Sequence, residues 1–427
     1  METHRYILKG NLLYSESPSV LRLIENGFLV CMDGFSAGAY EQLPAAFAGL
    51  PVVDYGDALI LPGLVDLHVH APQYTYRGIG LDLELLEWLK TYTYPEETKF
   101  SDLQYADAAY SQFVHALLKS PTTRASIFAT VHVDATLLLM EKLEKSGLVC
   151  YVGKVNMDRN CASELMEGSA MLSTEATLAF VDEAKRRFVR TFPILTPRFI
   201  PACSDALMIS LSEIQKRYSL PVQSHLSENK DEISWVRSLA PESKNYADAY
   251  ARFHLFGGDV QTVMAHCVWS EEEEVALMKD RGVFVAHCPQ SNMNVASGIA
   301  PIRKYLSRGL RLGLGTDVAG GSNLSVFRAM ADAIQSSKLY YRHVDASAVP
   351  LTLAEAFYMG TKGGGMFFGK VGSFEPGYEF DALVMDDAGF GSVRSFSLHD
   401  RLSRLIYLPE NAKIRAKYVK GTLLFSD

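Results

Sequence analysis

The sequence lacks the features that would place the protein in a membrane or on nucleic acid. No stretch of its 427 residues approaches the ~20 apolar residues that a membrane-spanning helix needs. The start of the chain shows no cationic segment followed by an apolar one, so no signal peptide is predicted. A net charge of −8 argues against nucleic acid or an anionic membrane as the main partner. These absences remove whole classes of partner without identifying one.

The six cysteines are scattered, and no Cys-x-x-Cys pair occurs among them. This spacing predicts neither a disulfide framework nor a thiolate zinc site, and it suits a reducing cytoplasm. Cys267 and Cys288 each directly follow a histidine in an apolar stretch. Free cysteine is commonly a small core residue, so we interpret both as buried spacers rather than nucleophiles. We expect a cytoplasmic protein.

Eight short apolar runs recur along the chain, at spacings that leave room for helices between them. They are Leu64–His70, Arg124–Val131, Cys150–Asn156, Pro193–Phe199, Val222–Leu226, Thr262–Cys267, Val283–Cys288 and Leu310–Asp317. Such runs are typical of buried parallel strands, and their alternation with helical segments predicts an α/β fold, a (β/α)8 TIM barrel. An open doubly wound sheet is the alternative, although no Gly-rich phosphate-binding fingerprint follows the first run.

The two ends of the chain differ from its middle. Residues 1–60 and 371–427 contain short strands and turns, including the turn cluster Gly372–Gly377. Chain ends often lie close together, so we expect these segments to pair into one small composite β-sandwich domain. The intervening residues 61–370 are predicted to form the barrel.

Two histidines two residues apart, His68 and His70, close the first apolar run. Side chains alternate between the faces of a strand, so both point the same way and can bind one metal ion. In a barrel, reactive groups collect at the C-terminal ends of the strands. Polar residues are predicted at five further strand ends, namely Arg198, His225, His266, His287 and Asp317. Their convergence on one face predicts an active site.

Neutral imidazoles with one carboxylate suit Zn²⁺ or Fe²⁺, and the absence of cysteine ligands favours a catalytic site over a structural one. The predicted ligands are His68, His70, His225 and Asp317. Such a metal lowers the pKa of a bound water toward about 7, which makes hydroxide available at neutral pH. Asp317 is also placed to accept the proton of this water, and His266 to orient the hydroxide by a hydrogen bond.

Glu228 lies three residues after His225, just beyond the predicted strand end. A carboxylic acid there can protonate a ring nitrogen of a substrate while hydroxide attacks the neighbouring carbon. An acid at the start of a helix is also a common placement without any catalytic role. The surrounding histidines favour the catalytic interpretation.

The motif Pro62–His70, together with Ser224–Glu228 and Gly315–Asp317, resembles the amidohydrolase superfamily. Further segments resemble the branch of that superfamily that deaminates guanine. They are His70–Tyr74, Leu85–Leu89, Thr196–Phe199, His287–Asn292 and Thr316–Gly321. The resemblance runs from about Leu61 to Asp381.

This resemblance implies hydrolytic deamination of guanine to xanthine and ammonia, by attack of hydroxide on C2, with one zinc per chain. Gln73 and Arg198 would hold the polar edge of the purine, and Phe199 would line the pocket. His225 would contact the substrate as well as the metal, and Glu228 would carry a proton to the ring. Homodimers are common in this family, so a homodimer active in purine breakdown or salvage is expected.

Three residues depart from the family pattern, and two others bear on the number of metal ions. Pro121 stands where glycine is usual and cannot adopt its positive φ, which affects the start of the second strand. Gln290 replaces a usual asparagine, and Pro72 precedes Gln73. Binuclear relatives carry a lysine at the end of the fourth strand, where Arg198 stands here. We therefore predict one metal and interpret Lys154, on the third strand, as structural.

Other functions remain open at this point. A related amidohydrolase would deaminate another amino-heterocycle, such as 8-oxoguanine, a pterin, an adenosine derivative or a triazine. A catalytically inactive homologue would keep the fold for binding or assembly. A nucleic-acid deaminase is disfavoured, because the chain is acidic and lacks the His-x-Glu…Pro-Cys-x-x-Cys signature. Trp88, Tyr92 and Tyr94 would suit a lid formed by residues 76–100.

Overall fold

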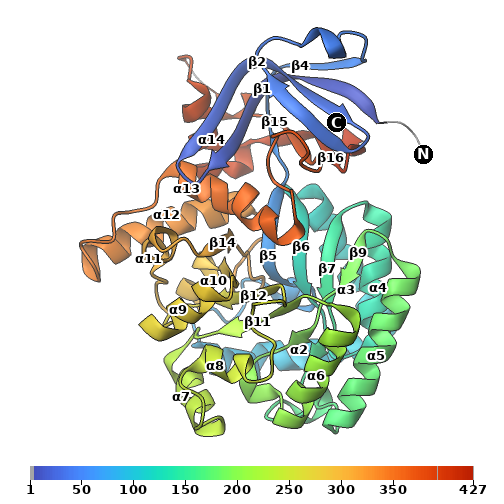
Figure 1. Ribbon diagram of the computed structural model, residues 1–427, viewed down its shortest axis with the longest axis vertical. Helices are drawn as coiled ribbons and strands as arrows, with labels where there is room; N and C mark the ends of the chain where they lie inside the picture. The colour runs from blue at the N-terminus through green and yellow to red at the C-terminus, as the bar shows by residue number, and fades with distance from the viewer. Residues whose placement is uncertain (1–3, 392, 427) are drawn as a thin grey trace.

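The computed structural model describes residues 4–391 and 393–426. Strands from both ends of the chain share one seven-stranded sheet, in the order β17-β16-β15-β4-β1-β2-β3, which lies in the upper part of Figure 1. Its strands are β1 (Arg5–Ser17), β2 (Val20–Met32), β3 (Phe35–Tyr40), β4 (Val52–Pro62), β15 (Ala382–Asp386), β16 (Lys413–Val419) and β17 (Thr422–Ser426). The N-terminal and C-terminal segments meet where β4 pairs antiparallel with β15.

Two groups of four parallel strands lie below this sheet. The first group, in spatial order, is β5 (Leu64–His70), β6 (Thr122–Phe128), β7 (Val149–Gly153) and β9 (Thr191–Pro193). The second is β11 (Val222–Leu226), β12 (Thr262–His266), β13 (Phe284–His287) and β14 (Arg311–Leu314). A parallel bridge between Leu195 and Val222 connects the groups on one side. On the other side, Asp317 N donates to the carbonyl of His68 at 2.8 Å.

Six of the eight predicted strands end earlier than expected, by one to six residues. The third and fourth runs are each interrupted, and their remainders pair separately as β8 (Val155–Asn156) and β10 (Thr196–Pro197). Pro193 and Pro197 end their segments, because proline has no N–H to continue a ladder. The eighth strand stops at Leu314, so Asp317 lies on the following loop rather than at a strand end.

Helices connect and surround the parallel strands (Figure 1). They are α1 (Leu85–Trp88), α2 (Tyr94–Thr98), α3 (Leu103–Lys119), α4 (Val133–Ser146), α5 (Ala170–Arg187), α6 (Asp205–Tyr218), α7 (Lys230–Leu239), α8 (Tyr246–Ala251), α9 (Glu272–Asp280), α10 (Pro289–Asn294), α11 (Ile302–Ser307), α12 (Val326–His343), α13 (Leu353–Tyr358) and α14 (Leu398–Tyr407). Ser204 caps α6, since its side chain accepts the Leu207 N–H. Side-chain caps of the same kind begin α3, α5 and α7.

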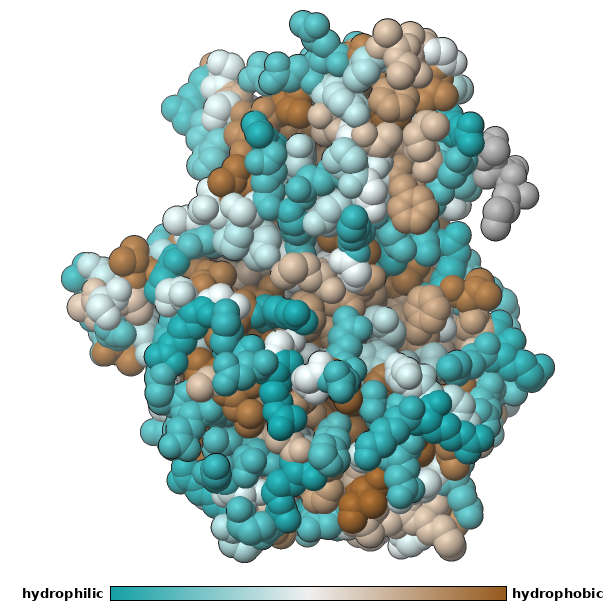
Figure 2. Space-filling model, in the orientation of Figure 1, coloured by the Kyte–Doolittle hydropathy of each residue, from teal (hydrophilic) through white to brown (hydrophobic). Residues whose placement is uncertain are grey.

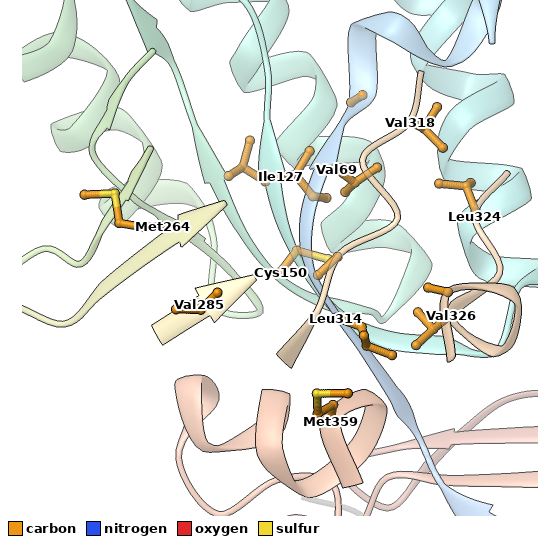
Figure 3. Close-up of a cluster of buried hydrophobic side chains, with 14 of the residues drawn as sticks. Val69, Ile127, Cys150, Met264, Val285, Leu314, Val318, Leu324, Val326 and Met359 are labelled. Carbon is orange, nitrogen blue, oxygen red and sulfur yellow. The ribbon is translucent and has the colours of Figure 1, made fainter. Parts of the chain in front are cut away.

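An apolar layer between strands and helices holds these elements in place. In Figure 3, side chains from neighbouring parallel strands gather with others from the surrounding segments, and Val69, Ile127, Cys150, Val318 and Met359 are among them. All of these side chains are fully buried or within 1% of it. Val69 enters this layer between the two histidines of β5, so strand alternation separates the core from the site.

The surface of the molecule is mixed in character. On the face shown in Figure 2, hydrophilic and apolar side chains are interspersed, and the apolar ones form small separate groups. Among the residues that the structure describes, no helix is long and apolar enough to cross a membrane.

A buried ion pair fastens the seven-stranded sheet to the parallel strands. Arg124 on β6 donates to both carboxylate oxygens of Asp381, at 2.5 and 2.8 Å, and to Glu379 at 2.7 Å. The side chains of Arg124 and Asp381 are 2% and 0% exposed. Replacing Arg124 by Met leaves the Asp381 carboxylate buried without its counter-ion, so we expect a loss of about 3–5 kcal/mol in the free energy of unfolding.

Urea unfolding of Arg124→Met measures this loss. The matched control is Arg5→Met, which removes the exposed pair between Arg5 and Asp33. Solvent screens that pair, so the control should unfold at the parent midpoint. Equal midpoints for both variants would contradict the role assigned to Arg124.

Candidate active site

Three histidines and one carboxylate from three segments of the chain meet at the C-terminal ends of the parallel strands. His68 Nε2 and His70 Nε2 lie 3.2 Å apart, and His225 Nε2 is 3.4 Å from His70 Nε2. Asp317 Oδ1 lies 3.2 Å from His68 Nε2 and 3.3 Å from His70 Nε2. The structure therefore brings together all four residues that the sequence predicts as metal ligands.

These separations suit a small metal ion. Tetrahedral ligands at roughly 2.0–2.1 Å from a zinc ion lie about 3.3 Å from one another. His70 Nε2 faces two other ring nitrogens and a carboxylate oxygen, although one ring nitrogen carries at most one hydrogen. Without a cation the remaining lone pairs would face each other, so the donor set and its spacing fit a bound metal.

Hydrogen bonds behind the rings fix which nitrogen faces the cluster. His225 Nδ1 donates to the backbone carbonyl of Arg198 at 2.6 Å, which leaves Nε2 as the free donor atom for a metal. His266 Nδ1 donates in the same way to Asn292 Oδ1 at 2.9 Å. Both assignments follow from the acceptors that the rings face.

Burial favours the neutral form of His68 and His225, which metal binding requires. It lowers the pKa of His68 to about 4, and it lowers that of His225 well below its usual value. Burial works in the opposite direction on Asp317, but the facing His68 and His70 hold the pKa of that carboxyl well below its usual range. His68 and His225 thus present neutral nitrogens beside one charged carboxylate.

A second buried acid, Asp66, positions the loop that carries Asp317. Asp66 Oδ1 accepts the backbone N–H groups of His68 and Thr316, and its Oδ2 accepts the Thr316 hydroxyl at 2.5 Å. A side chain at Gly315 would come within 2.8 Å of His68 Cβ, so only glycine allows this close approach. Asp317 itself adopts a left-handed φ of +46°, which directs its carboxylate toward the histidines.

Glu228 lies beside the cluster, next to His266. Glu228 Oε2 is 3.3 Å from His266 Nε2, which is in turn 3.7 Å from Asp317 Oδ2. Burial, and then the negative charge of Asp317, raise the pKa of Glu228 to about 8, while Ser297 donates to its other oxygen at 3.1 Å. A carboxyl group in this environment is protonated at neutral pH and can act as an acid.

One cavity joins this cluster to the residues expected to hold a substrate. Its lining includes His70, His225, Glu228, His266 and Asp317 of the cluster. Polar Gln73 and Arg198 and apolar Phe199, Trp88 and Leu89 also line it. A cavity in which polar groups converge beside apolar side chains is typical of a site for a small molecule.

The segment between β5 and α3 forms part of the cavity wall. Leu85, Trp88 and Leu89 contribute lining side chains, and Tyr94 lies close to Arg198, whose guanidinium carbon is 5.3 Å from the centre of the tyrosine ring. Trp88 Nε1 donates to the carbonyl of Ile79 at 3.2 Å. The segment therefore contributes three apolar side chains to the cavity wall, and its action as a lid stays a prediction.

Sequence reasoning missed three buried acids that support the site. Besides Asp66, these are Glu97, which bonds to Gln73 and Arg198, and Glu232, which accepts the backbone N–H of Glu228 at 3.1 Å. The alternation of Asp66 with His68 and His70 is a signal that could have identified the first. Glu232 forms a capping box with Asn229, so the spacing of these two residues is also a local signal. Glu97 gains its partners only through the tertiary fold.

Several residues singled out in the sequence have no assigned role in the site. His287 is buried, and neither of its ring nitrogens has a partner among the described residues. Cys288 lies near His68 and Asp317, but burial raises the pKa of its thiol well above the usual value. Lys154 forms a buried ion pair with Glu167.

The departures from the family pattern also have structural explanations. Pro121 directly precedes β6, and its carbonyl accepts the Leu64 N–H at 3.1 Å, so the start of the strand is intact. Gln290 accepts the Ser322 N–H at 2.7 Å and donates to Asp332 at 3.1 Å. It therefore braces the loop that follows Asp317.

Parallel strands whose C-terminal ends present three histidines and a carboxylate are typical of metal-dependent hydrolases. The chain belongs to the amidohydrolase family, which it matches over residues 59–424.

Several similar proteins, at 33–44% identity, are guanine deaminases. The chain is 38% identical to the guanine deaminase of Dictyostelium discoideum over 380 residues, covering 87% of this chain and 83% of that protein. It is 33% identical to the guanine deaminase of Escherichia coli over 425 residues, covering 96% and 93% of the two chains. The crystal structure of guanine deaminase from C. acetobutylicum, with guanine bound in its active site, superposes with a TM-score of 0.95 at 44% identity, covering 99% of this chain and 100% of that one.

Proposed function

We propose that the protein catalyses the hydrolytic deamination of guanine to xanthine and ammonia. One observation carries this proposal: a single cavity holds the cluster of histidines and Asp317, the buried acid Glu228, and the polar pair of Gln73 and Arg198. The reaction needs a nucleophile, a proton donor and hydrogen-bonding groups that orient a flat heterocycle. The similarity to guanine deaminases supports guanine as that heterocycle.

We infer that one zinc ion per chain is the cofactor, held by His68, His70, His225 and Asp317, with Fe²⁺ as the alternative. Three imidazoles and a carboxylate at these separations support a mononuclear site. When bound, the zinc supplies a hydroxide nucleophile at neutral pH.

The side chains of the protein then move protons and hold the substrate. Asp317 accepts the proton of the nucleophile and returns it to the leaving amino group, while His266 orients the nucleophile. Glu228 donates a proton to the ring nitrogen next to C2 as the new C2–O bond forms. The bond between C2 and the exocyclic amino nitrogen then breaks, ammonia leaves with the proton returned by Asp317, and the remaining hydroxyl proton restores the acid form of Glu228. These are the three residues to which we assign catalytic roles.

Binding of the purine falls to the other lining residues. We assign the polar edge of the base to Gln73 and Arg198, stacking to Phe199, and further contacts to His225 and Glu228. Phe199 is 5% exposed and packs against Trp235, with ring centres 5.9 Å apart, which supports a rigid apolar wall.

We further infer that the chain forms a barrel domain and a composite β-domain. The two groups of parallel strands, with their connecting bridge and the contact from Asp317 to β5, support a closed (β/α)8 barrel of residues 61–370. Residues 1–60 and 371–427 would form the composite domain, folded as a sandwich over its own apolar core of Leu8, Leu29, Phe380 and Val384.

The setting of the protein is inferred from its chemistry and its family. Free thiols throughout the described chain support a reducing cytoplasm. Similarity to guanine deaminases supports a role in purine breakdown or salvage. A homodimer follows from the family resemblance alone.

Ammonia release from guanine by the purified protein, with zinc measured on the same sample, tests the function. Xanthine and ammonia at about one zinc per chain would support both the reaction and the mononuclear site. Full zinc without guanine turnover would point to another amino-heterocycle, such as 8-oxoguanine, a pterin, an adenosine derivative or a triazine.

Replacing Gln73 by Ala should raise the KM for guanine at least about tenfold, because a hydrogen bond to the base is lost. Zinc content should stay near one per chain, since Gln73 does not contact the four predicted ligands. Steady-state kinetics and metal analysis of the variant check both points. A Gln73→Ala protein with the parent KM would contradict the assigned orientation of the substrate.

A further inference from the structure

A buried carboxylate that has no part in the proton transfers joins the two residues assigned to the purine. Glu97, on α2, is 0% exposed. Its Oε1 accepts a hydrogen bond from Gln73 Nε2 at 2.9 Å and from Arg198 Nη2 at 3.0 Å. Its Oε2 accepts from Arg198 Nη1 at 2.5 Å. One carboxylate therefore holds both of the side chains that we assign to the polar edge of the purine.

Glu97 determines how the amide of Gln73 is turned. The Gln73 NH₂ group donates to Glu97, and Gln73 Oε1 accepts the N–H of Ala319 at 3.2 Å. Because the amide is bonded at both ends, it cannot flip without losing both bonds. Ala319 lies two residues after Asp317, so the same pair of bonds fixes Gln73 relative to the metal cluster.

Glu97 also determines the net charge that the cavity wall presents. Burial disfavours the charged form of Arg198, but the Glu97 carboxylate holds the pKa of the guanidinium above its usual value. The guanidinium therefore stays charged and its charge is compensated within the wall. This arrangement offers hydrogen-bond donors without a net positive charge.

Four other ionisable side chains interact electrostatically with Glu97, namely Tyr76, Tyr94, Tyr110 and His132. Burial raises the pKa of each tyrosine and lowers that of His132. All four are therefore uncharged near neutral pH, and Arg198 supplies the positive charge that faces Glu97.

We propose that Glu97 is a positioning residue that makes the cavity prefer an uncharged purine over a purine anion. The proposal rests on the proposed function. Xanthine carries one more ring carbonyl than guanine and is the more acidic of the two, so the product ionises at a pH where the substrate is neutral. Because Glu97 already compensates the charge of Arg198, a purine anion is attracted only weakly to the guanidinium. This weak attraction does not offset the hydration that the anion loses on entering the cavity. Ionised product therefore leaves readily.

Binding of xanthine to the zinc-loaded protein tests this preference. Calorimetry should be carried out below and above the pH at which xanthine loses its first proton. In the parent protein we expect binding to weaken as xanthine ionises. In Glu97→Gln, the charge of Arg198 is no longer compensated, so xanthine should bind more tightly as it ionises. We expect the affinity for the xanthine anion to be about tenfold higher than in the parent protein. The KM for guanine should rise by about tenfold in the same variant, with a smaller change in kcat, because Gln73 and Arg198 lose their orientation.

Glu96→Gln is the matched control on the same helix. Glu96 accepts hydrogen bonds from Thr75 Oγ1 and Lys99 Nζ, each at 2.6 Å, and it does not line the cavity. This variant should keep the parent KM and the parent xanthine profile. Glu97→Asp restores the charge at a shorter reach, so it should recover the xanthine profile while the KM stays raised.

Two results would overturn the inference. One is that the parent protein binds ionised xanthine more tightly than neutral xanthine. This result does not depend on whether any variant folds. The other is a folded Glu97→Gln protein with the parent xanthine profile. A parent protein that releases no ammonia from guanine would overturn the proposed function, while the xanthine profiles decide the inference separately.

Discussion

Replacing Glu228 by glutamine should lower kcat for guanine by about 10²–10⁴-fold, the range expected for loss of a positioned proton donor. Glutamine keeps the shape of the side chain and can still accept the hydrogen bond from Ser297. Its amide has no proton to give to the ring nitrogen. The fold and the zinc content should therefore remain at parent values while turnover is lost.

The pH profile gives a second readout of the same residue. The pKa of Glu228 is raised to about 8, first by burial and then by the charge of Asp317. The carboxyl is protonated below this value, so kcat/KM should fall as the pH rises through it. The residual activity of Glu228→Gln should lack this alkaline decline.

Glu274→Gln serves as the control for removing a buried acid. Glu274 accepts hydrogen bonds from Ser227 Oγ at 2.7 Å and from Ala247 N at 2.9 Å, outside the cavity. We expect its kcat to stay near the parent value. If Glu228→Gln retained parent activity, the proton would have to come from another group, and the catalytic assignment of Glu228 would be wrong.

The ligand cluster could be predicted because its signals are local. His68 and His70 are two residues apart on one strand, and strand alternation alone brings them together. His225 and Asp317 follow later apolar runs, and the ends of parallel strands share one edge of a sheet. The prediction failed only in detail at Asp317, which a tight loop rather than the strand itself carries to the cluster.

Glu97 could not be predicted in the same way. It contacts Arg198 across 101 positions of sequence, and nothing in its neighbourhood distinguishes it from the adjacent Glu96. Glu232, by contrast, forms a local capping box with Asn229, so the spacing of these two residues is a signal that could have identified it.

The strands, like the site, could be predicted only in part. The apolar runs marked where strands occur, because burial on both faces leaves a continuous hydrophobic signature. They did not mark where the third and fourth strands break, since those breaks depend on prolines and on neighbours in space. The order of the seven-stranded sheet, in which β4 lies between β15 and β1, likewise depends on pairing between distant segments.

Replacing Asp317 by asparagine should have the largest effect of all, because one carboxylate has two roles. Asp317 Oδ1 lies within 3.3 Å of two ring nitrogens, and the facing histidines keep its pKa well below the usual range. An amide is a weaker ligand for zinc and cannot accept the proton of the nucleophile. We expect zinc affinity to fall at least about 10–100-fold, and kcat to fall by about 10³-fold or more.

Measuring the variant at saturating zinc separates these two effects. Activity that returns to the parent value once zinc is bound would mean that Asp317 only holds the metal, and another group would have to move the proton. Activity that stays low with one zinc per chain would identify Asp317 as the base. Asp332→Asn is the control, because Asp332 is a nearly buried acid that bonds to Gln290 away from the cavity. It should match the parent in zinc content and in kcat, so any deficit in Asp317→Asn belongs to the site itself.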